Sequence, residues 1–381
     1  MTLKSPARSR IPLSQPSISE EDIAAVLSVL RTPTLSLGPK VKSFENAVAA
    51  YSGAKHAVAV NSGTSGLHIC LVAAEVGEGH EVITSPFSFV ASANCAIFQN
   101  ATPVFVDIDP DTLNIDPSQI EVKVTDRTKA IVPVDVFGQP ADIEAIGAIA
   151  EARNLTIVQD ACEAIGAERN GKRVGGAGIA KAAVFAFYPN KQMTTGEGGI
   201  VVTDDEPFAN ILRSLANQGR DDAGTWMNHV RLGYNYRLDE MSAALGLSQI
   251  SRLDDILARR SQVAAWYGER LHGVDGVDVP YVAPETTRMS WFVYVIRVAP
   301  NIDRDALIPR LQADGVPVRP YFVPIHLQPY YRERFGYKEG DFPVTEAVAK
   351  TTLAIPFFTD MTESRVDYVC DRIVAHIGRR L

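Results

Sequence analysis

The 381-residue sequence has few cysteines and lacks the patterns that several classes of protein require. Its four cysteines are widely spaced and form no paired motif, which argues against a disulfide framework or a zinc site. It has no run of about eighteen apolar residues and no apolar segment near its N-terminus, so neither a membrane span nor a secretory signal is expected. We therefore expect a cytoplasmic protein with reduced thiols and no metal.

Blocks of basic charge and the common nucleotide-binding fingerprints are also absent. Lysine and arginine number 37 against 45 acidic residues, a formal net charge of −8. Nucleic acid and anionic membranes are therefore not expected partners, although an acidic protein can still bind a phosphorylated ligand locally. No Gly-x-Gly-x-x-Gly follows a strand and no Walker A lysine occurs, which argues against dinucleotides and ATP.

From residue 56 onward, apolar strand-like runs alternate with helical patterns. Such alternation predicts a mostly parallel sheet covered by helices on both faces, with ligands bound beyond the strand ends. The expected strands are residues 56–60, 81–85, 103–106, 130–134, 155–159, 183–187 and 200–203. The expected helices are residues 20–30, 64–76, 89–98, 142–153 and 206–217. At this length the chain can form two domains and a large core.

A different pattern begins near residue 238. An apolar stripe at helical spacing predicts a long helix that reaches about residue 271; its members are Leu247, Ile250, Leu253 and Leu257. A strand over 291–298 and a helix over 303–314 follow. We therefore expect a large domain over residues 1–250, which begins with an arm of little regular structure, and a smaller C-terminal α+β domain over residues 251–381.

Two of the apolar runs lead to a single ionisable residue, Asp160 in one case and Lys191 in the other. A lysine amine can form a Schiff base with pyridoxal phosphate (PLP), and a carboxylate can keep the pyridine nitrogen of PLP protonated. The protonated ring stabilises a carbanion next to nitrogen. Either residue alone would more often be a surface lysine or a helix-capping aspartate, but the pair favours a PLP site.

A small, hydroxyl-rich turn follows the first expected strand. Glycines let the backbone approach an anion closely, and the hydroxyls and free N–H groups at a helix N-terminus bind it. The same residues could form an ordinary N-cap. With Asp160 and Lys191 elsewhere in the chain, we interpret this turn, residues 61–66, as the binding site of a cofactor phosphate.

Four blocks of sequence, in the expected order, resemble the DegT/DnrJ/EryC1/StrS family of sugar aminotransferases. They are Asn-Ser-Gly-Thr-Ser (61–65), Gln-Asp-Ala-Cys-Glu-Ala-Ile-Gly-Ala (159–167), Phe-Tyr-Pro-Asn-Lys-Gln-Met-Thr-Thr-Gly-Glu-Gly-Gly (187–199) and Gly-Tyr-Asn-Tyr-Arg-Leu (233–238). The resemblance implies the α/β fold type I architecture of PLP-dependent transferases. It also implies a homodimer with shared active sites, and amino transfer from L-glutamate to a keto-sugar nucleotide through pyridoxamine phosphate.

The resemblance assigns roles to individual residues of the cofactor site. Lys191 would be the Schiff-base lysine and Asp160 the partner of the ring nitrogen, which makes them the two catalytic residues. Phe89 would stack on the cofactor ring, although a core phenylalanine is an equally good interpretation without the resemblance. Glu163 would lie near the phenolic oxygen of the cofactor, where many relatives have glutamine, and it favours amination at position 4 of the sugar.

By the same resemblance Gly63, Thr64 and Ser65 would hold the phosphate, and further residues would contribute to binding the phosphate and the substrate. The family commonly has a phosphate-binding serine where this chain has Ala186, so phosphate binding should depend more on Asn235, which in relatives reaches across from the neighbouring subunit. Arg237 would bind a carboxylate or phosphate, or else form a surface ion pair. Tyr321 and His326 belong to a segment that resembles the lining of the sugar-nucleotide pocket, or else form an aromatic packing corner.

The expected function is therefore a PLP-dependent aminotransferase acting on a 4-keto-6-deoxyhexose nucleotide, as in GDP-perosamine-like synthesis. A 3-keto-sugar or cyclitol aminotransferase of the same family is the main alternative. A PLP-dependent sugar dehydratase is disfavoured because that relative has histidine in place of Lys191. A non-catalytic PLP-binding sensor is disfavoured by the intact pair of Asp160 and Lys191, and by the absence of a fused DNA-binding segment.

Overall fold

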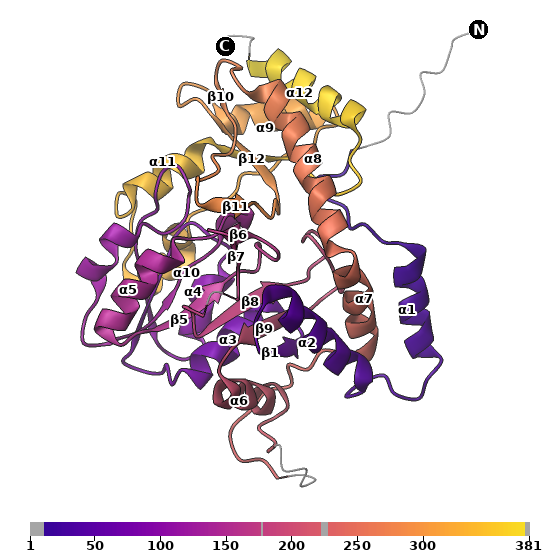
Figure 1. Ribbon diagram of the computed structural model, residues 1–381. Helices are drawn as coiled ribbons and strands as arrows, with labels where there is room; N and C mark the ends of the chain where they lie inside the picture. Colours follow the sequence, from indigo (N-terminus) through magenta and orange to yellow (C-terminus); the bar gives the residue numbers. More distant parts are fainter. Residues whose placement is uncertain (1–10, 177, 222–227, 378–381) are drawn as a thin grey trace.

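A seven-stranded sheet forms the centre of the computed structural model, which describes residues 11–176, 178–221 and 228–377 (Figure 1). The strands lie in the order β1-β9-β8-β5-β4-β2-β3. Their bounds are β1 His56–Val60, β2 Glu81–Thr84, β3 Thr102–Phe105, β4 Thr128–Val132, β5 Thr156–Asp160, β8 Ala182–Ala186 and β9 Gly199–Thr203. Neighbours from β3 to β8 pair in parallel, whereas β9 is antiparallel to both β8 and β1. The mostly parallel sheet of the predicted α/β fold is confirmed.

Helices cover both faces of this sheet because alternate strand residues bury apolar side chains on opposite sides. Val158 of β5 packs in a core that includes α3, α4 and α6, whereas Ile157 packs on the opposite face against α5. Helices α2 and α7 cover β1, β8 and β9 on the same face as α5. The helix bounds are α2 Pro39–Ser52, α3 Gly63–Ala73, α4 Ala91–Ile97, α5 Ile143–Arg153, α6 Glu206–Ala216 and α7 Glu240–Ser251.

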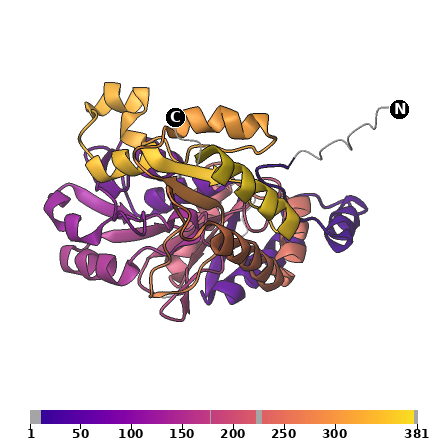
Figure 2. The same cartoon turned by 90° about the horizontal axis from the view of Figure 1, so that it is seen from above.

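A second core surrounds a three-stranded antiparallel sheet in the order β10-β12-β13. Its elements are β10 Val277–Asp278, β12 Tyr294–Val298, β13 Thr352–Ile355, α8 Leu253–Leu271, α9 Arg304–Ala313 and α12 Glu363–Ile377. Figure 2 shows the orange and yellow C-terminal elements gathered along one side of the molecule. The strand and helix predicted beyond residue 290 correspond to β12 and α9.

The long helix predicted to reach residue 271 is interrupted at Arg252, where one helix ends and α8 begins. Arg252 has φ −120° and ψ 17°, outside the helical region. Its guanidinium instead pairs with the buried carboxylate of Asp22 at 2.6 Å. The first turn of α8 packs in the large core through Leu253 and Leu257, and its later turns pack in the second core. The expected division near residue 250 stays a prediction, and it falls close to this interruption.

The segment before the first helix, α1 Glu20–Leu30, has no helix or strand over residues 11–19. The first ten residues of the predicted arm lie outside the described residues. Ile11 packs in the second core, and the carbonyl of Leu13 accepts a hydrogen bond from the N–H of Phe357 at 2.9 Å. Ser19 and Asp22 form a reciprocal capping box at the start of α1, as the sequence predicts.

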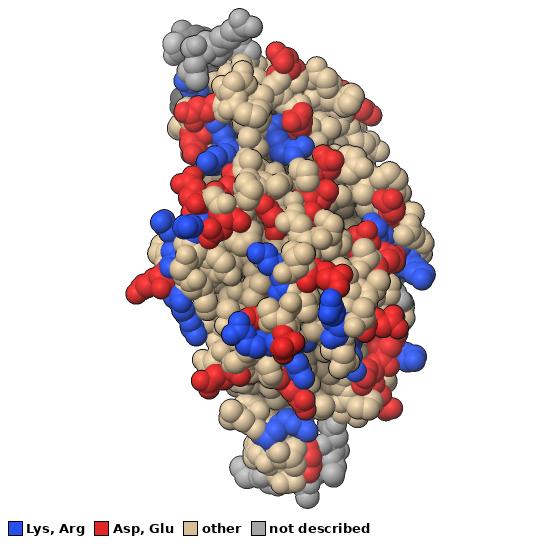
Figure 3. Space-filling model, turned by 90° about the vertical axis from the view of Figure 1, so that its left-hand side faces the viewer, with Lys and Arg blue, Asp and Glu red and all other residues tan. Residues whose placement is uncertain are grey.

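Several short elements complete the described chain. A small sheet, which the sequence did not predict, joins β11 Thr286–Arg288, β6 Glu168–Arg169 and β7 Lys172–Arg173. The remaining helices are α10 Pro329–Phe335, α11 Pro343–Thr351, and the 3-10 turns Pro117–Gln119, Glu121–Lys123, Val136–Gly138 and Ile325–Leu327. On the face shown in Figure 3, acidic and basic side chains are interspersed. None of the helices in the described ranges has the length and apolar character needed to cross a membrane.

Candidate active site

Asp160 is the last residue of β5, and its neighbours fix both its backbone and its carboxylate. Its N–H donates to the carbonyl of Pro133 at 2.8 Å. Its Oδ2 accepts a hydrogen bond from Ser92 Oγ at 2.6 Å, and its Oδ1 accepts one from the N–H of Cys162 at 3.2 Å. The side chain is only 5% exposed. A carboxylate held in one orientation at low dielectric is well suited to bind a charged N–H group.

Lys191 follows β8 after a short turn and points its amine at a second buried acid. Its N–H donates to the carbonyl of Tyr188 at 2.9 Å, and its Nζ lies 3.5 Å from Glu163 Oε1. Burial raises the pKa of Glu163, while the positive charge of Lys191 and a hydrogen bond from the N–H of Phe137 oppose that rise. The proton affinity of Glu163 is thus increased beside the amine of Lys191.

The hydroxyl-rich turn lies at the same edge of the sheet. Ser62 caps α3, because its side chain accepts a hydrogen bond from the N–H of Ser65 at 3.1 Å. At Gly63, an added Cβ would lie 2.7 Å from Cys162 Sγ and 2.8 Å from Ala186 Cβ, so any larger residue would displace these side chains. The close approach places the N-terminus of α3 beside the ends of β5 and β8. The structure therefore brings the predicted phosphate turn to the residues that surround Asp160 and Lys191.

Phe89 precedes α4 and exposes 63% of its surface, although it lies next to buried site residues. Its carbonyl lies 3.1 Å from Ser92 Oγ, the hydroxyl that donates to Asp160. A single residue, Ser92, therefore connects the backbone of Phe89 to the carboxylate of Asp160. An exposed ring in this place is suited to stack on a flat heterocycle.

These features together fit PLP. The buried carboxylate of Asp160 suits a protonated pyridine nitrogen, and the glycine turn at a helix N-terminus suits a phosphate. Near Lys191, the buried Oδ1 of Asn190 has no hydrogen-bond partner among the described residues, which leaves an acceptor free for a ligand. When bound, PLP supplies an electron sink in its protonated ring.

Asn235 and Arg237 lie on a segment that runs past the phosphate turn. The carbonyl of Tyr236 accepts a hydrogen bond from the N–H of Asn61 at 2.8 Å, which ties this segment to the end of β1. The side chain of Asn235 is exposed. Arg237 Nη1 donates to Asn217 Oδ1 at 3.1 Å, and no carboxylate of the described residues lies within 4.0 Å of its guanidinium. The surface ion pair considered for Arg237 is thus not present within the described part of one subunit.

Tyr321 and His326 have different surroundings. The half-buried ring of Tyr321 stacks on Phe137 with centroids 6.3 Å apart, and burial raises the pKa of its phenol with a further contribution from the charge of Glu163. Tyr321 therefore lies at the site. His326 is fully buried, and its Nε2 lies 3.0 Å from Glu346 Oε1. This placement favours the packing role considered for His326 over a contact with substrate.

The sequence reasoning missed the residues that hold the site residues in place. Ser92 fixes Asp160, the N–H of Phe137 binds Glu163, and the ring of Phe292 lies 3.8 Å from Lys191 Nζ. These contacts join residues far apart in the chain. No local pattern around Phe137 or Phe292 indicates them.

The fold and the site define a PLP-dependent transferase of fold type I. The sequence matches the DegT/DnrJ/EryC1/StrS aminotransferase family over residues 16–374, so the chain belongs to that family and is a PLP-dependent aminotransferase. Spore coat polysaccharide biosynthesis protein SpsC of Bacillus subtilis is 41% identical over 95% of this chain and 96% of its own. GDP-perosamine synthase of Caulobacter vibrioides is 38% identical, with coverage of 94% and 96%.

Solved structures show the same relationship. The chain superposes on S. venezuelae DesV with a TM-score of 0.89 and 36% identity, covering 95% of each chain. The PLP form of Spr1654 from Streptococcus pneumoniae gives a TM-score of 0.91 with 27% identity, covering 98% of this chain and 100% of that one. The fold type predicted from the four sequence blocks is confirmed.

Proposed function

We propose that this enzyme transfers the amino group of L-glutamate to a 4-keto-6-deoxyhexose nucleotide and yields a 4-amino sugar nucleotide. The observation that carries the proposal is the convergence of Asp160, Lys191 and Glu163 at one edge of the sheet. The similarity to GDP-perosamine synthase supports a sugar nucleotide as the acceptor. Glu163 in place of the glutamine of many relatives supports position 4.

Each site residue has a defined task in this proposal. Asp160 holds a proton on the ring nitrogen through a carboxylate that Ser92 keeps in place. Gly63, Thr64 and Ser65 bind the phosphate at the N-terminus of α3. Phe89 excludes water from one face of the ring. Lys191 carries the cofactor before the substrate amine arrives.

Lys191 Nζ would transfer protons in the reaction, and Glu163 would hold one. Once the substrate amine has displaced it, Lys191 Nζ would remove the proton from Cα of glutamate and would give that proton to the cofactor carbon to which the lysine had been bonded. Glu163, with its raised pKa, shares a proton with the phenolic oxygen of the cofactor. The same two groups act in the opposite order when the keto sugar is the acceptor, because the two half-reactions are chemically the reverse of each other.

We also propose that two subunits share each site and that the enzyme acts in the cytoplasm. Asn235 would reach the phosphate of the neighbouring subunit, since its side chain is exposed on its own subunit. Arg237 and Tyr321 would contact the anionic and hydroxyl groups of the substrates. Arg237 suits this task because no described carboxylate neutralises it in one subunit.

A substrate panel tests the proposed function. The purified enzyme, supplied with PLP and L-glutamate, is offered 4-keto and 3-keto hexose nucleotides, and 2-oxoglutarate is measured. We expect turnover with a 4-keto-6-deoxy substrate and a product with nitrogen at C4. Turnover only with 3-keto substrates would move the assignment to C3, and no turnover with any keto sugar would contradict the proposal.

A further inference from the structure

The free amine of Lys191 rests between an aromatic face and a carboxylate. Its Nζ lies 3.8 Å from the centroid of the Phe292 ring and 3.5 Å from Glu163 Oε1. Phe292 is buried. An ammonium over an aromatic face is attracted by the ring quadrupole, and the attraction is strongest where water is excluded. The two groups therefore hold the amine in one place.

The two residues that flank the Lys191 amine, Phe292 and Glu163, are both hydrogen-bonded to the backbone of Phe137. The N–H of Phe137 donates to Glu163 Oε2 at 2.9 Å, and the carbonyl of Phe137 accepts a hydrogen bond from the N–H of Phe292 at 3.2 Å. Phe137 itself has a φ of +57°, which non-glycine residues rarely adopt. At Gly138, an added Cβ would lie 3.0 Å from the backbone nitrogen of Trp291. The conformation of this turn therefore brings Glu163 and Phe292 together.

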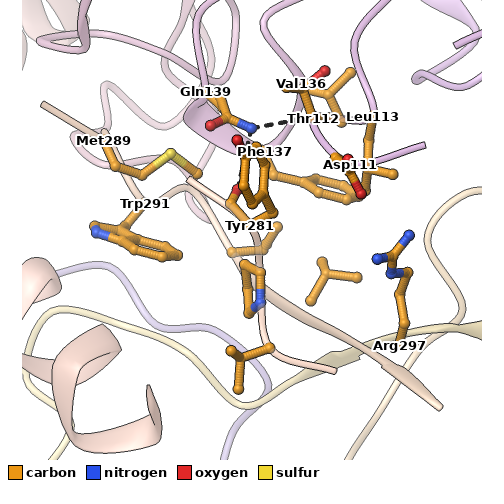
Figure 4. Close-up of a pocket in the computed structure, with 14 residues that line it drawn as sticks. Asp111, Thr112, Leu113, Val136, Phe137, Gln139, Tyr281, Met289, Trp291 and Arg297 are labelled. Atoms are coloured by element: carbon orange, nitrogen blue, oxygen red, sulfur yellow. Dashed lines mark hydrogen bonds between the residues drawn. The ribbon is translucent and has the colours of Figure 1, made fainter. Parts of the chain in front are cut away.

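The turn at Phe137 is incompletely packed beside Trp291. A cavity of about 30 Å³ lies beside the turn, lined by Phe137 and Trp291 with Gln139, Tyr281 and Met289 (Figure 4). Such a space has room for about one water molecule. Packing on this side is therefore incomplete at Trp291, the residue that precedes Phe292.

Arg260 of α8 supplies the missing support. Its Nη2 donates to the carbonyl of Phe292 at 2.6 Å and its Nε donates to the carbonyl of Trp291 at 2.8 Å. The guanidinium is buried, and no described carboxylate lies within 4.0 Å of it. A buried charge without a counterion is costly. The hydrogen bonds to these two consecutive carbonyls compensate part of that cost, together with one to Thr359 Oγ1 at 3.2 Å and the ring of Phe357, whose centroid lies 4.8 Å from Cζ.

We propose that Phe292 and Glu163 hold the Lys191 amine whenever it is not bonded to the cofactor, and that Arg260 is the positioning residue for Phe292. The inference rests on the proposed function, in which the lysine is released in each half-reaction and must return to the same carbon. An amine kept within reach retains the high effective concentration that a freely rotating side chain would lose.

The reactivity of the amine tests this assignment directly. The enzyme is converted to its pyridoxamine phosphate form with L-glutamate, and carbamoylation of Lys191 by cyanate is followed by peptide mass spectrometry. Lys181, which is ion-paired at the surface, serves as the internal reference. In Phe292→Leu we expect Lys191 to react about 2- to 30-fold faster relative to Lys181, because the cation–π attraction is lost.

Phe358→Leu is the matched control, since Phe358 is equally buried but packs in the second core away from Lys191. It should leave the ratio unchanged. Arg260→Met should raise the ratio in the same direction as Phe292→Leu, and Arg260→Lys should restore part of the protection by donating to one carbonyl. If Arg260→Met does not fold, the Phe292→Leu result decides.

An unchanged ratio in Phe292→Leu would overturn the inference. Failure of the proposed function gives a different result, because wild-type enzyme would then not attach PLP to Lys191 or consume glutamate at all. A wild-type enzyme that does both, together with an unchanged ratio in the variant, would refute only the role of Phe292.

Discussion

Replacing Asp135 with asparagine should make the free energy of unfolding less sensitive to a rise in pH. Asp135 is fully buried behind the site, where its Oδ1 accepts a hydrogen bond from the N–H of Ala141 at 2.8 Å and both oxygens accept from Gln159 Nε2 at 2.9–3.0 Å. Burial raises the pKa of Asp135 from 3.8 to about 7, and the negative charges of Asp160 and Glu163 add to the rise.

The sign of the effect follows from proton binding in the two states. Above pH 3.8 the unfolded chain has released this proton, whereas the folded protein keeps it until pH 7 or so. The stability of the wild type relative to a variant without this carboxylate therefore falls as pH rises through that window and levels off above it. Over the range from about pH 5 to about pH 8, the loss amounts to about 2–3 kcal/mol.

Asp135→Asn preserves the shape and the acceptor for Ala141, and a rotated Gln159 amide can accept from the new amide group. We would measure urea unfolding of the two proteins without cofactor at several pH values and compare their difference at each pH, so that other titrating groups cancel. Asp126→Asn, at an exposed position, is the control and should show a constant difference. A constant difference for Asp135→Asn as well would refute the argument.

Three further changes probe the site. Gly63→Ala should weaken PLP affinity about 10-fold or more in a fluorescence titration, because its Cβ would meet Cys162 and Ala186. Gly77→Ala is the control and should leave the affinity unchanged, since a Cβ there meets open space. Equal affinities of the two variants would contradict the role of Gly63 in phosphate binding. Phe89→Leu should weaken PLP affinity about 3- to 10-fold through lost stacking, and unchanged affinity would argue against ring contact. Mixing equal amounts of Lys191→Ala and Asn235→Ala subunits should restore about a quarter of wild-type activity if Asn235 acts across a dimer, and none if it acts within its own subunit.

The large sheet could be predicted from the sequence because its strands are short apolar runs separated by clear turns. Each of the seven expected strands lies within a few residues of an observed one. The direction of β9 could not be predicted, since pairing with β1 and β8 is decided by contacts distant in sequence. The helix interruption at Arg252 was missed because the apolar stripe continues through it; the buried Asp22, more than two hundred residues away, binds Arg252 there.

The candidate active site, like the fold, could be predicted only in part from the sequence. Asp160, Lys191 and the glycine turn could be predicted because each lies at or shortly after the end of a strand, and parallel strands end at one edge of the sheet. The supports of the site could not be predicted, because they come from other elements and reach the site only through the folded backbone. Arg260 on α8 holds Phe292 by its carbonyl, and neither residue has a sequence signature of that role.

The most direct test of the central claim is the identity of the lysine that binds the cofactor. Purified enzyme incubated with PLP is reduced with borohydride, digested, and mapped by mass spectrometry. We predict that the pyridoxyl group is found on Lys191 alone, and that Lys191→Ala loses both the cofactor absorbance and turnover. Labelling of a different lysine, or full activity in Lys191→Ala, would contradict the account.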